Sequence, residues 1–366
     1  MQSLASRQQC TPLPKKSLKF EVQSFALGTA TSGAEVAATY KSQVTGRNIL
    51  ITGVSPNGIG SAGLEALAAQ SPNLITVTGR STTKLNESIA QAKAAFPEAN
   101  IRPLIMDLSS IESVRKAAAE FNATSENLDI LINNAGVMTI PTRTLSVDGI
   151  EMQFATNHVG HYLFTCLILP KLIAAAKDSP KGATRIINVS SYAHVLNPIR
   201  FSDHNWEGRE VPEEEKGDAD MLLFFQENDV SFTKYTAMGA YGQSKTANAL
   251  FSVELTRRLY EKYGILSLAL HPGAINSNLG RHMTPEQIEY WSTKMTDVMF
   301  FKSTDQGTST TLVAALDPKL NDWEKSVGYY LVDCQFSTPK AWAVDEDFGK
   351  RLWTLSEEIV GEKFDY

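Results

Sequence analysis

Short apolar segments recur along this chain, and polar or glycine-rich stretches separate them. Six such segments span residues 48–52, 74–78, 101–107, 128–133, 184–190 and 266–271. They are rich in Ile, Leu and Val, a composition that favours buried β-strands when the run is this short. The intervening segments are rich in Ala, Glu and Lys, and those at 84–95 and 111–121 are typical of helices. A seventh apolar run at 329–332 is a further strand candidate.

Strands that alternate with helices predict a parallel sheet covered by helices on both faces. We therefore expect an α/β fold, a doubly wound parallel sheet of about seven strands, formed as a single domain over residues 46–366. Residues 1–45 are expected to be an N-terminal extension with a short helix near 34–40. The chain contains no internal repeat or low-complexity block that would indicate another architecture.

One region breaks the alternation and is expected to be an insertion. Residues 195–238 include an Asp- and Glu-rich run at 212–220, typical of a solvated loop, and an apolar run at 221–225. The apolar run either covers a substrate pocket or anchors the loop to the core, and the sequence leaves both roles open. A second segment, at about 278–303, is expected on the substrate side. Its apolar side chains, which equally suit plain core packing, are Met283, Trp291, Met295, Met299, Phe300 and Phe301.

The composition narrows the classes of partner. With 43% hydrophobic and 20% charged residues, the 366-residue chain is typical of a globular protein. Its net charge of -6 argues against nucleic acid or an anionic membrane as the main partner. Cys10, Cys166 and Cys334 are odd in number and scattered, which favours a reducing compartment over a disulfide framework. No clustered His or Cys spacing indicates a metal site.

The N-terminal residues bear on location. They lack the apolar core of a signal peptide, and no segment approaches the length and hydropathy of a membrane-spanning run. We therefore expect a cytoplasmic protein without an integral membrane segment. The first 20 residues are basic and free of acids, which leaves an organelle-targeting role open.

Residues with chemical potential follow the predicted strands, where ligands bind in open α/β sheets. The first strand is followed by a glycine-rich turn that contains Gly53, Ser55, Gly58, Ile59 and Gly60. Glycines let the backbone approach a pyrophosphate, and the amides at the next helix N-terminus meet its charge. The position of this turn after the first strand indicates a dinucleotide site.

The ends of the next strands favour one dinucleotide over another. Arg80 follows the second strand, Lys84 lies one turn later, and no acidic residue stands at this strand end. A carboxylate there would suit the ribose 2′-hydroxyl of NAD, whereas an arginine suits the 2′-phosphate of NADP. Asp107 and Leu108, after the third strand, are placed to bind the adenine edge, although ordinary turn chemistry would also explain them. The fourth strand is followed by Asn133, Asn134, Ala135 and Gly136, where the adenosine half must pass.

Tyr241 and Lys245 are four residues apart in a segment with the composition of a helix, so they share one helical face. A phenol ordinarily loses its proton near pH ~10. A fixed cation beside it favours the phenolate, and we expect Lys245 to lower the pKa of Tyr241. A tyrosine tuned in this way can pass a proton to or from a carbonyl oxygen.

Taken together, these motifs resemble the short-chain dehydrogenase/reductase family from about residue 46 to residue 280. The resemblance is strongest to the branch of retinol dehydrogenases and WW-domain oxidoreductases, which many fungal and plant reductases of specialised metabolism also resemble. The motifs that carry it are the glycine-rich turn, residues 133–136, 157–165, 188–194, Tyr241 with Lys245, and residues 271–273. The resemblance implies a Rossmann-type fold and hydride transfer with a nicotinamide cofactor.

The resemblance also implies roles for individual residues. Tyr241 would be the general acid in reduction, with Lys245 lowering its pKa and binding the nicotinamide ribose. Ser191 would hydrogen-bond the substrate oxygen, with Ser190 as its competitor, and Asn157 would hold a water that links Lys245 to solvent. The residues at the nicotinamide amide would be Pro272, Gly273, Ile275 and Ser277. Members of the family often form homodimers.

Two spacings depart from the family pattern. Four residues separate Gly53 from Gly58 where three are usual, and the interval between Ser191 and Tyr241 is lengthened by the insertion. Since the serine and the tyrosine must converge, the extra residues are expected to loop out over the pocket mouth. His158, close to Asn157, is expected to be a helix-face residue rather than a metal ligand, as is His161.

The function predicted from the sequence is an NADP-dependent oxidoreductase that moves hydride between NADP(H) and a carbonyl or alcohol. Its small-molecule substrate is expected to be a hydrophobic ketone or aldehyde, such as a retinoid, steroid or specialised metabolite. Two alternatives stay open: a non-catalytic NADP-binding scaffold or sensor, and a nucleotide-sugar epimerase or dehydratase.

Overall fold

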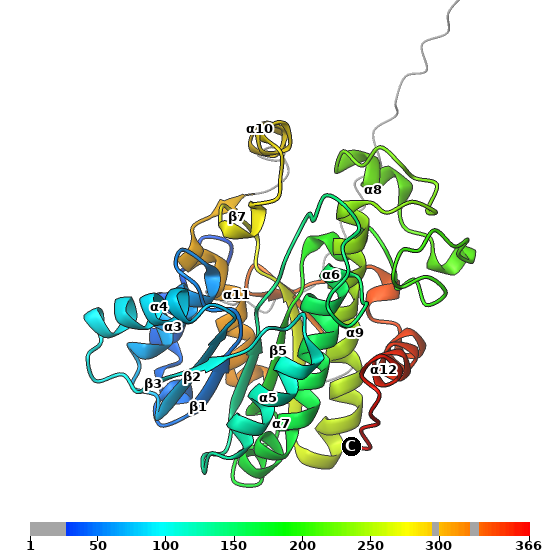
Figure 1. Cartoon of the computed structure of the whole chain (residues 1–366). Coiled ribbons are helices and arrows are strands. Elements are labelled where there is room, and N and C mark those ends of the chain that lie inside the picture. Colours follow the sequence, from blue (N-terminus) through cyan, green and yellow to red (C-terminus); the bar gives the residue numbers. More distant parts are fainter. Residues whose placement is uncertain (1–26, 295–299, 323–328) are drawn as a thin grey trace, which may run out of the picture.

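An eight-stranded sheet with helices on both faces forms the centre of the fold (Figure 1). The computed structural model describes residues 27–294, 300–322 and 329–366. The strand order is β10-β9-β6-β5-β4-β1-β2-β3, and neighbouring strands are parallel except β9 and β10. The strands are β1 (Asn48–Ile51), β2 (Leu74–Gly79), β3 (Ile101–Ile105), β4 (Ile130–Asn133), β5 (Thr184–Val189), β6 (Ile265–His271), β9 (Tyr330–Val332) and β10 (Gln335–Phe336). A separate pair joins β7 (Ala274–Ile275) to β8 (Phe301–Lys302).

The helices fill the connections between these strands. They are α1 (Gly33–Thr39), α2 (Lys41–Val44), α3 (Ile59–Ala68), α4 (Thr82–Ala95), α5 (Ile111–Asn122), α6 (Met152–Phe154), α7 (Gly160–Ala176), α8 (Ala219–Phe224), α9 (Ala237–Tyr263), α10 (Pro285–Lys294), α11 (Thr304–Leu316) and α12 (Glu346–Val360). A π-helical turn, Ala155–Val159, joins α6 to α7. Short 3₁₀ turns occupy Tyr192–Val195, Glu213–Glu215, Asn278–Gly280, Pro318–Leu320 and Ala341–Ala343.

The prediction of a doubly wound parallel sheet is confirmed, but the number of strands in the sheet is eight rather than about seven. The missed strand is β10, a two-residue partner of β9 that is too short to leave an apolar run in the sequence. The third predicted strand ends at Ile105 rather than at residue 107. It lies at the edge of the sheet, which explains why Pro103 is accommodated inside it.

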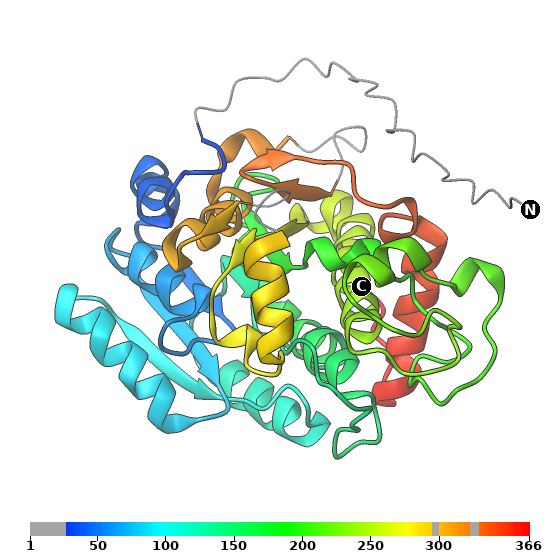
Figure 2. The same cartoon turned by 90° about the horizontal axis from the view of Figure 1, so that it is seen from above.

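Alternate residues of the strands supply two cores, one on each face of the sheet. In β1, Ile49 and Ile51 pack with α1, α3, α4 and α11, whereas Leu50 packs with α5, α7, α9 and α12. The loops at the carboxyl ends of the strands carry α8 and α10, which both lie beyond this edge of the sheet (Figures 1 and 2). The site described below is built at the same edge.

The chain from Leu27 to Val44 packs onto this domain. Val36 and Ala37 of α1 are fully buried in the core that includes α3 and α11. The Ala34 N–H donates to Asp305 Oδ1 at 3.1 Å, which ties α1 to the first turn of α11. This packing continues the domain core across residue 46, the boundary expected from the sequence.

Contrary to the expectation from the sequence, one described helical run, Met152–Ala176, is long and apolar enough to cross a membrane by length and composition alone. Its side chains are mostly buried against the sheet, α5 and α9. Tyr162, Leu163 and Phe164 have no exposed surface. The run is therefore the central core helix of one face.

Candidate active site

The carboxyl ends of β1 and β4 are held together by Thr52. Its side-chain oxygen accepts hydrogen bonds from the backbone N–H groups of Asn134 (2.9 Å) and Ala135 (3.0 Å). The Asn134 amide donates in turn to the carbonyl oxygens of Thr52 (2.9 Å) and Gly53 (3.3 Å). Gly53 has φ +73°, and a Cβ there would lie 2.5 Å from Cα of Ala135. These predicted cofactor residues therefore shape the floor of the site between two strand ends.

The glycine-rich turn leads into a helix start that no side chain caps. Gly58 is the N-cap of α3, whereas Ser or Asp side chains cap α4, α5, α11 and α12. The turn is one residue longer than is usual in the family, and its residue Asn57 adopts the left-handed conformation, at φ +60°. The Gly58 N–H donates to the Ser55 carbonyl at 3.2 Å and closes the turn. A Cβ on Gly60 would lie 2.8 Å from Asn134 Nδ2, so a side chain does not fit there without displacement.

This turn fits the pyrophosphate of a dinucleotide. The first N–H groups of α3, which begins at Ile59, have no acceptor within the helix and no capping side chain. Such N–H groups and the helix dipole attract an anion. The chain thus leaves its donors free at the position where the sequence predicts a phosphate.

The residues after β2 and β3 differ in their surroundings. Arg80 and Lys84 are exposed, and neither forms an ion pair with an acidic residue of the described ranges. Asp107 Oδ1 accepts from the N–H (3.0 Å) and hydroxyl (2.7 Å) of Ser109, so part of its carboxylate closes its own turn. Leu108 is buried, with its carbonyl against Gly160, where a Cβ would lie 2.2 Å away. Arg80 and Lys84 are therefore the more available pair for a ligand.

Asn133 is placed differently from the sequence expectation. Its side chain is buried and donates to Thr165 Oγ1 (3.0 Å) and Asn188 Oδ1 (2.9 Å). The residue is 1% exposed, so this amide links β4 to β5 and α7 rather than facing the adenosine half of a cofactor. Gly136 lies nearer the chemistry, because a Cβ there would meet Asn157 Oδ1 at 3.3 Å and Lys245 Nζ at 3.6 Å.

Tyr241 and Lys245 lie on one face of α9, both buried, with Nζ 5.7 Å from the phenol ring centroid. The Lys245 ammonium donates to the carbonyl of Val189, the last residue of β5, at 2.9 Å. Ser191 lies two residues after Val189 in extended backbone, at φ -160°. Its neighbour Ser190 donates to the Lys245 carbonyl at 2.7 Å and is 2% exposed. Ser190 is therefore committed to α9, which leaves Ser191 as the serine that faces the phenol.

The pKa expectation for the tyrosine is wrong in this structure. Burial raises the pKa of Tyr241 to about 12, and the hydrogen bond with the Ser191 side chain acts in the opposite direction. Burial also lowers the pKa of Lys245 to about 7. The sequence argument considered the charge of the ammonium but not the removal of both groups from water, and desolvation dominates.

Asn157 lies in the π-helical turn, and its side-chain amide forms three hydrogen bonds with other protein groups. Oδ1 accepts from the Val137 N–H at 2.8 Å, while Nδ2 donates to the Val137 carbonyl (2.9 Å) and to Ser244 Oγ (2.9 Å). Ser244 immediately precedes Lys245 on α9. The side chain expected to hold a water instead braces the β4 loop against the helix that carries the tyrosine and lysine.

The sequence did not indicate the contacts of the two histidines near Asn157. His161 Nδ1 donates to the Asn157 carbonyl at 3.0 Å, and its Nε2 lies 2.8 Å from Thr52 Oγ1. Burial lowers the pKa of His161 to about 4 and that of His158 to about 3, so both imidazoles are neutral. Both histidines lie in helical segments, as expected, and their side chains are buried. No three His, Cys, Asp or Glu side chains in the described ranges are arranged to hold a metal.

The carbonyl of Ser191 is held by two buried side chains from distant parts of the chain. Tyr330 Oη donates to it at 3.0 Å, and His194 Nδ1 donates at 2.7 Å. The Lys340 N–H donates to His194 Nε2 at 3.3 Å, which fixes the neutral tautomer with its proton on Nδ1. Tyr330 lies 139 residues from Ser191, so only the folded sheet reveals this contact.

The residues predicted at the nicotinamide end follow β6. Gly273 has φ +103°, and a Cβ there would lie 2.7 Å from the Lys302 side chain. Pro272 is buried, and Ile275 contacts Gly307 of α11, where a Cβ would meet Ile275 Cγ1 at 2.7 Å. Ser277 Oγ accepts from the Leu279 N–H at 3.4 Å. These four residues lie in the short connection, which includes β7, between β6 and the substrate-side segment.

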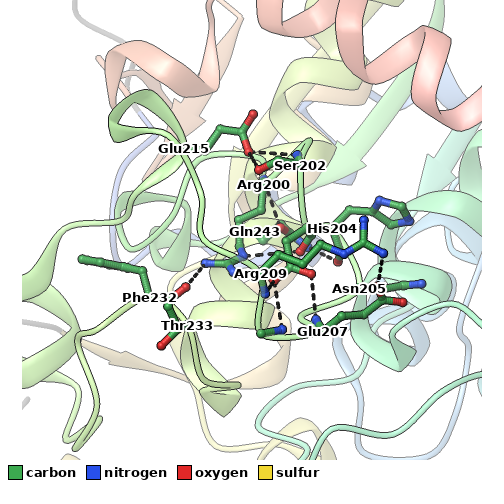
Figure 3. A network of polar contacts seen from close by, with 12 residues as sticks. Arg200, Ser202, His204, Asn205, Glu207, Arg209, Glu215, Phe232, Thr233 and Gln243 are labelled. Atoms are coloured by element: carbon green, nitrogen blue, oxygen red, sulfur yellow. Dashed lines mark hydrogen bonds and ion pairs between the residues drawn. The ribbon is translucent and has the colours of Figure 1, made fainter.

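The insertion is tied to the tyrosine-bearing helix by a buried arginine (Figure 3). The Arg200 guanidinium has no exposed surface and donates to Asp203 Oδ2 (2.8 Å) and the Phe232 carbonyl (2.8 Å). It also lies over the Trp206 ring, 4.1 Å from the centroid. Gln243 of α9 accepts from the Arg200 N–H at 3.1 Å. This link attaches the insertion to α9 at Gln243, two residues after Tyr241.

The acidic run is not a uniformly solvated loop, which corrects the sequence prediction. Glu213 and Glu214 are exposed, but Glu215 is 2% exposed and accepts from the N–H (2.9 Å) and hydroxyl (2.5 Å) of Ser202. Arg351 of α12 donates to the other oxygen of Glu215 at 3.2 Å. One carboxylate of the run is therefore an internal anchor.

The apolar run of the insertion packs in the same hydrophobic cluster as the tyrosine. Leu222, within α8, and Phe225, directly after it, belong to a hydrophobic cluster with Tyr241, and Met283 and Trp291 pack against this cluster. The Phe225 and Trp291 rings meet edge to face with centroids 5.4 Å apart. The run therefore anchors the insertion to the cluster that contains Tyr241, and its role in covering a substrate pocket stays a prediction. We call this cluster the apolar cover.

The remaining apolar residues of the substrate-side segment are not part of the described cover. Phe300 and Phe301 are 55% and 38% exposed. Met295 and Met299 lie outside the described residues, as does Cys10. Cys166 and Cys334 are buried and free.

Comparison with known proteins gives the family. Residues 47–202 match the short chain dehydrogenase family. The chloroplastic short-chain dehydrogenase TIC 32 A of Brassica napus is 36% identical over 334 residues, 91% of this chain and 94% of the relative. Retinol dehydrogenase 13 of Homo sapiens is 34% identical over 346 residues, 92% of this chain and 93% of the relative.

Solved structures share the fold. A crystal structure of an uncharacterised protein from Mycobacterium paratuberculosis is 28% identical with a TM-score of 0.61, covering 88% of this chain and 96% of that one. The NADPH-bound carbonyl reductase from chicken fatty liver is 22% identical with a TM-score of 0.52, covering 78% and 91%. Since the relatives match over nearly their whole length, the chain belongs to the short-chain dehydrogenase/reductase family, in a branch that includes retinol dehydrogenases.

Proposed function

We propose that this oxidoreductase uses NADP(H) to interconvert a hydrophobic carbonyl compound and its alcohol. The observation that carries the proposal is the placement of Tyr241 and Lys245. Both are buried beside Ser191 at the carboxyl ends of the strands, next to the uncapped start of α3. Groups of this kind are rarely buried without a function.

Tyr241, Ser191 and Lys245 have separate roles in the proposed reduction of a carbonyl. With a pKa of about 12, Tyr241 carries its proton at neutral pH and is ready to donate it to a carbonyl oxygen. Ser191 holds the same oxygen and stabilises the charge that develops on it. Lys245 is fixed by the Val189 carbonyl one turn away from the phenol. A bound reduced nicotinamide supplies the hydride to the carbonyl carbon, so that carbon and oxygen together gain hydride and proton.

The preference for NADP over NAD rests on the end of β2. Arg80 is exposed there without an acidic partner in the described ranges, and no carboxylate follows the strand to bind a ribose 2′-hydroxyl. The chicken carbonyl reductase of the same fold is described with NADPH bound. An NADP(H) pool that is kept reduced would favour carbonyl reduction as the working direction.

The apolar cover supports a bulky hydrophobic substrate. Leu222, Phe225, Met283 and Trp291 belong to the same hydrophobic cluster as Tyr241, which gives the tyrosine apolar surroundings. Relatives named retinol dehydrogenase agree with a ketone or aldehyde of the retinoid, steroid or specialised-metabolite kind. A screen in which only small polar sugars reacted would contradict this substrate class.

The test compares NADPH and NADH oxidation by the purified protein across a chemically diverse panel of ketones and aldehydes. We expect NADPH-dependent turnover of apolar carbonyls. Tyr241→Phe should abolish turnover and leave NADPH binding, followed by cofactor fluorescence, largely intact. Full activity of this variant would refute the tyrosine mechanism. Cofactor binding without turnover of any compound would instead favour a scaffold or sensor.

Location belongs to the proposal as well. We propose a cytoplasmic protein, and fractionation of cells that express the full chain tests this location.

A further inference from the structure

We propose that Arg281 and Arg80 together form a two-arginine site for the 2′-phosphate of NADP(H). This inference rests on the proposed cofactor and extends it to a residue of the substrate-side segment. Arg80 belongs to the nucleotide half of the sheet, whereas Arg281 leads into α10. The site would therefore connect the choice of cofactor to the segment that covers the tyrosine.

The position of Arg281 is fixed by two hydrogen bonds in series. Its Nη1 donates to the carbonyl of Asn278 at 3.0 Å. The side chain of Asn278 donates to the carbonyl of Pro56 at 3.3 Å. Pro56 lies in the glycine-rich turn after β1, so these bonds hold the arginine against the predicted pyrophosphate turn.

Arg80 reaches the same turn from the neighbouring strand. It directly follows β2, which pairs with β1 in parallel register. The Val54 N–H donates to the Thr78 carbonyl at 2.9 Å and joins the turn to the end of β2. A Cβ on Gly79 would lie 3.4 Å from the Val54 carbonyl, so the two backbones are in contact here. Arg80 and Arg281 thus flank one turn, each held from a different part of the chain.

The charges at this position are unbalanced. Burial and then the charge of Arg80 lower the pKa of Arg281. Burial, followed by the charges of Arg281 and Arg80, lowers the pKa of His282. The basic groups therefore act on one another without a compensating carboxylate among the described residues. Facing like charges cost free energy that a bound dianion would offset.

This pair is distinct because each of the other described arginines has an acidic partner or is buried against backbone carbonyls. Most form ion pairs, for example Arg47 with Asp129 and Arg102 with Glu126. Arg185 has no ion pair but donates to backbone carbonyls, including that of Ala314 at 2.7 Å. Among the described arginines, Arg80 and Arg281 alone neither pair with an acidic residue nor are buried against several backbone carbonyls. Arginine binds phosphate through two parallel N–H groups, so two of them suit one phosphate.

The phosphate in question is the one on the ribose rather than the pyrophosphate. The free N–H groups of α3 already serve the pyrophosphate, whereas this fold holds the ribose hydroxyls at the end of the second strand. Arg281 stands before α10, whose Trp291 packs on Phe225 above Tyr241. A 2′-phosphate held by both arginines would therefore also steady the apolar cover.

The experiment measures binding of two probes to the full-length protein by isothermal titration calorimetry. Adenosine 2′,5′-bisphosphate carries the 2′-phosphate, and 5′-AMP is the same molecule without it. Arg281→Gln removes the charge and keeps most of the side chain. We expect this variant to raise the Kd of the bisphosphate by about ten- to a hundredfold and to change the Kd of 5′-AMP by less than about twofold.

Arg80→Gln should behave in the same way, and Arg209→Gln is the matched control. Arg209 is exposed on the insertion and pairs with Glu207, so its removal should leave both probes unaffected. An equal loss for both probes would place Arg281 at the pyrophosphate and overturn the inference. No change in either Kd would overturn it as well. The outcome is separable from the oxidoreductase proposal, because selective loss of the bisphosphate in a protein without turnover would sustain the site while rejecting the activity.

Discussion

Ser190 and Ser191 are neighbours in the sequence, yet their hydroxyls serve different parts of the molecule. Ser190 donates to the Lys245 carbonyl from a buried position, whereas Ser191 faces Tyr241. Ser191→Ala should lower kcat by about 10²–10³ with little change in stability. Ser190→Ala should instead lower the free energy of unfolding by about 1–3 kcal/mol, because a buried acceptor loses its donor. Steady-state kinetics and urea unfolding of both variants check this, and a reversed pattern would exchange their roles.

The opposed pKa shifts of Tyr241 and Lys245 give a pH prediction. Tyr241, with a pKa of about 12, keeps its proton throughout the neutral range, whereas Lys245 loses its charge as pH rises through about 7. The ammonium makes the phenol a better acid, so kcat/KM for carbonyl reduction should fall above pH about 7. A profile from pH 5 to pH 9 with saturating cofactor measures it. A flat profile would show that the lysine does not titrate in this range, and activity retained by Lys245→Arg should lack the decline.

Among the elements of the fold, the sequence best predicted the β-strands that a local run of apolar residues determines. The six main strands follow from runs such as Ile49–Ile51, because burial on both faces demands continuous apolar residues. The sequence did not predict β10, because a strand of two residues is too short to show an apolar pattern. The sequence also did not predict the π-helical turn at Asn157 or the contact between Tyr330 and Ser191. Each depends on partners that only the folded sheet brings together. Family resemblance located Tyr241 and Lys245 but could not reveal how strongly burial shifts their pKa values.

The insertion behaves as one element because Arg200 holds it. Asp203 accepts from the guanidinium and from the N–H groups of residues 207–209. Arg200→Ala would leave the Asp203 carboxylate buried without its cation, a change that costs about 3–5 kcal/mol. We expect faster hydrogen exchange over residues 200–235 and a lower kcat/KM, because the apolar cover loosens. Arg209→Ala, which removes only an exposed ion pair, should change stability by about 1 kcal/mol or less. Equal exchange in the two variants would contradict a holding role for Arg200.

At the scale of the whole molecule, α12 decides which surfaces are available for self-association. It packs against α9 and the π-helical turn, where Trp353 meets Tyr162 edge to face at 5.0 Å. His158 Nε2 lies 2.8 Å from Ser356 Oγ, and the Arg258 guanidinium lies 4.1 Å from the Trp353 ring centroid. The apolar flank of α7 and α9 is therefore covered by the chain itself. The homodimer expected from the family would need another surface.

The covering by α12 can be tested with a pair of tryptophans. Trp353 is 3% exposed in the core shared by α7, α9 and α12, whereas Trp291 is partly exposed in the apolar cover. Trp353→Ala should lower the free energy of unfolding by about 3–5 kcal/mol, because a large cavity opens between three helices. Trp291→Ala should cost less than half as much and act mainly on KM for bulky substrates. Urea unfolding followed by far-UV circular dichroism compares the two.

The same pair separates the roles of the two surfaces in self-association. If α12 shields an apolar flank, partial loosening by Trp353→Ala should increase the measured molar mass in light scattering as protein concentration rises. Trp291→Ala should show no such increase, because the flank stays covered. A wild-type protein that dimerises while Trp353→Ala changes neither stability nor mass would show that α12 is itself part of the contact between subunits, and the covering argument would then fail.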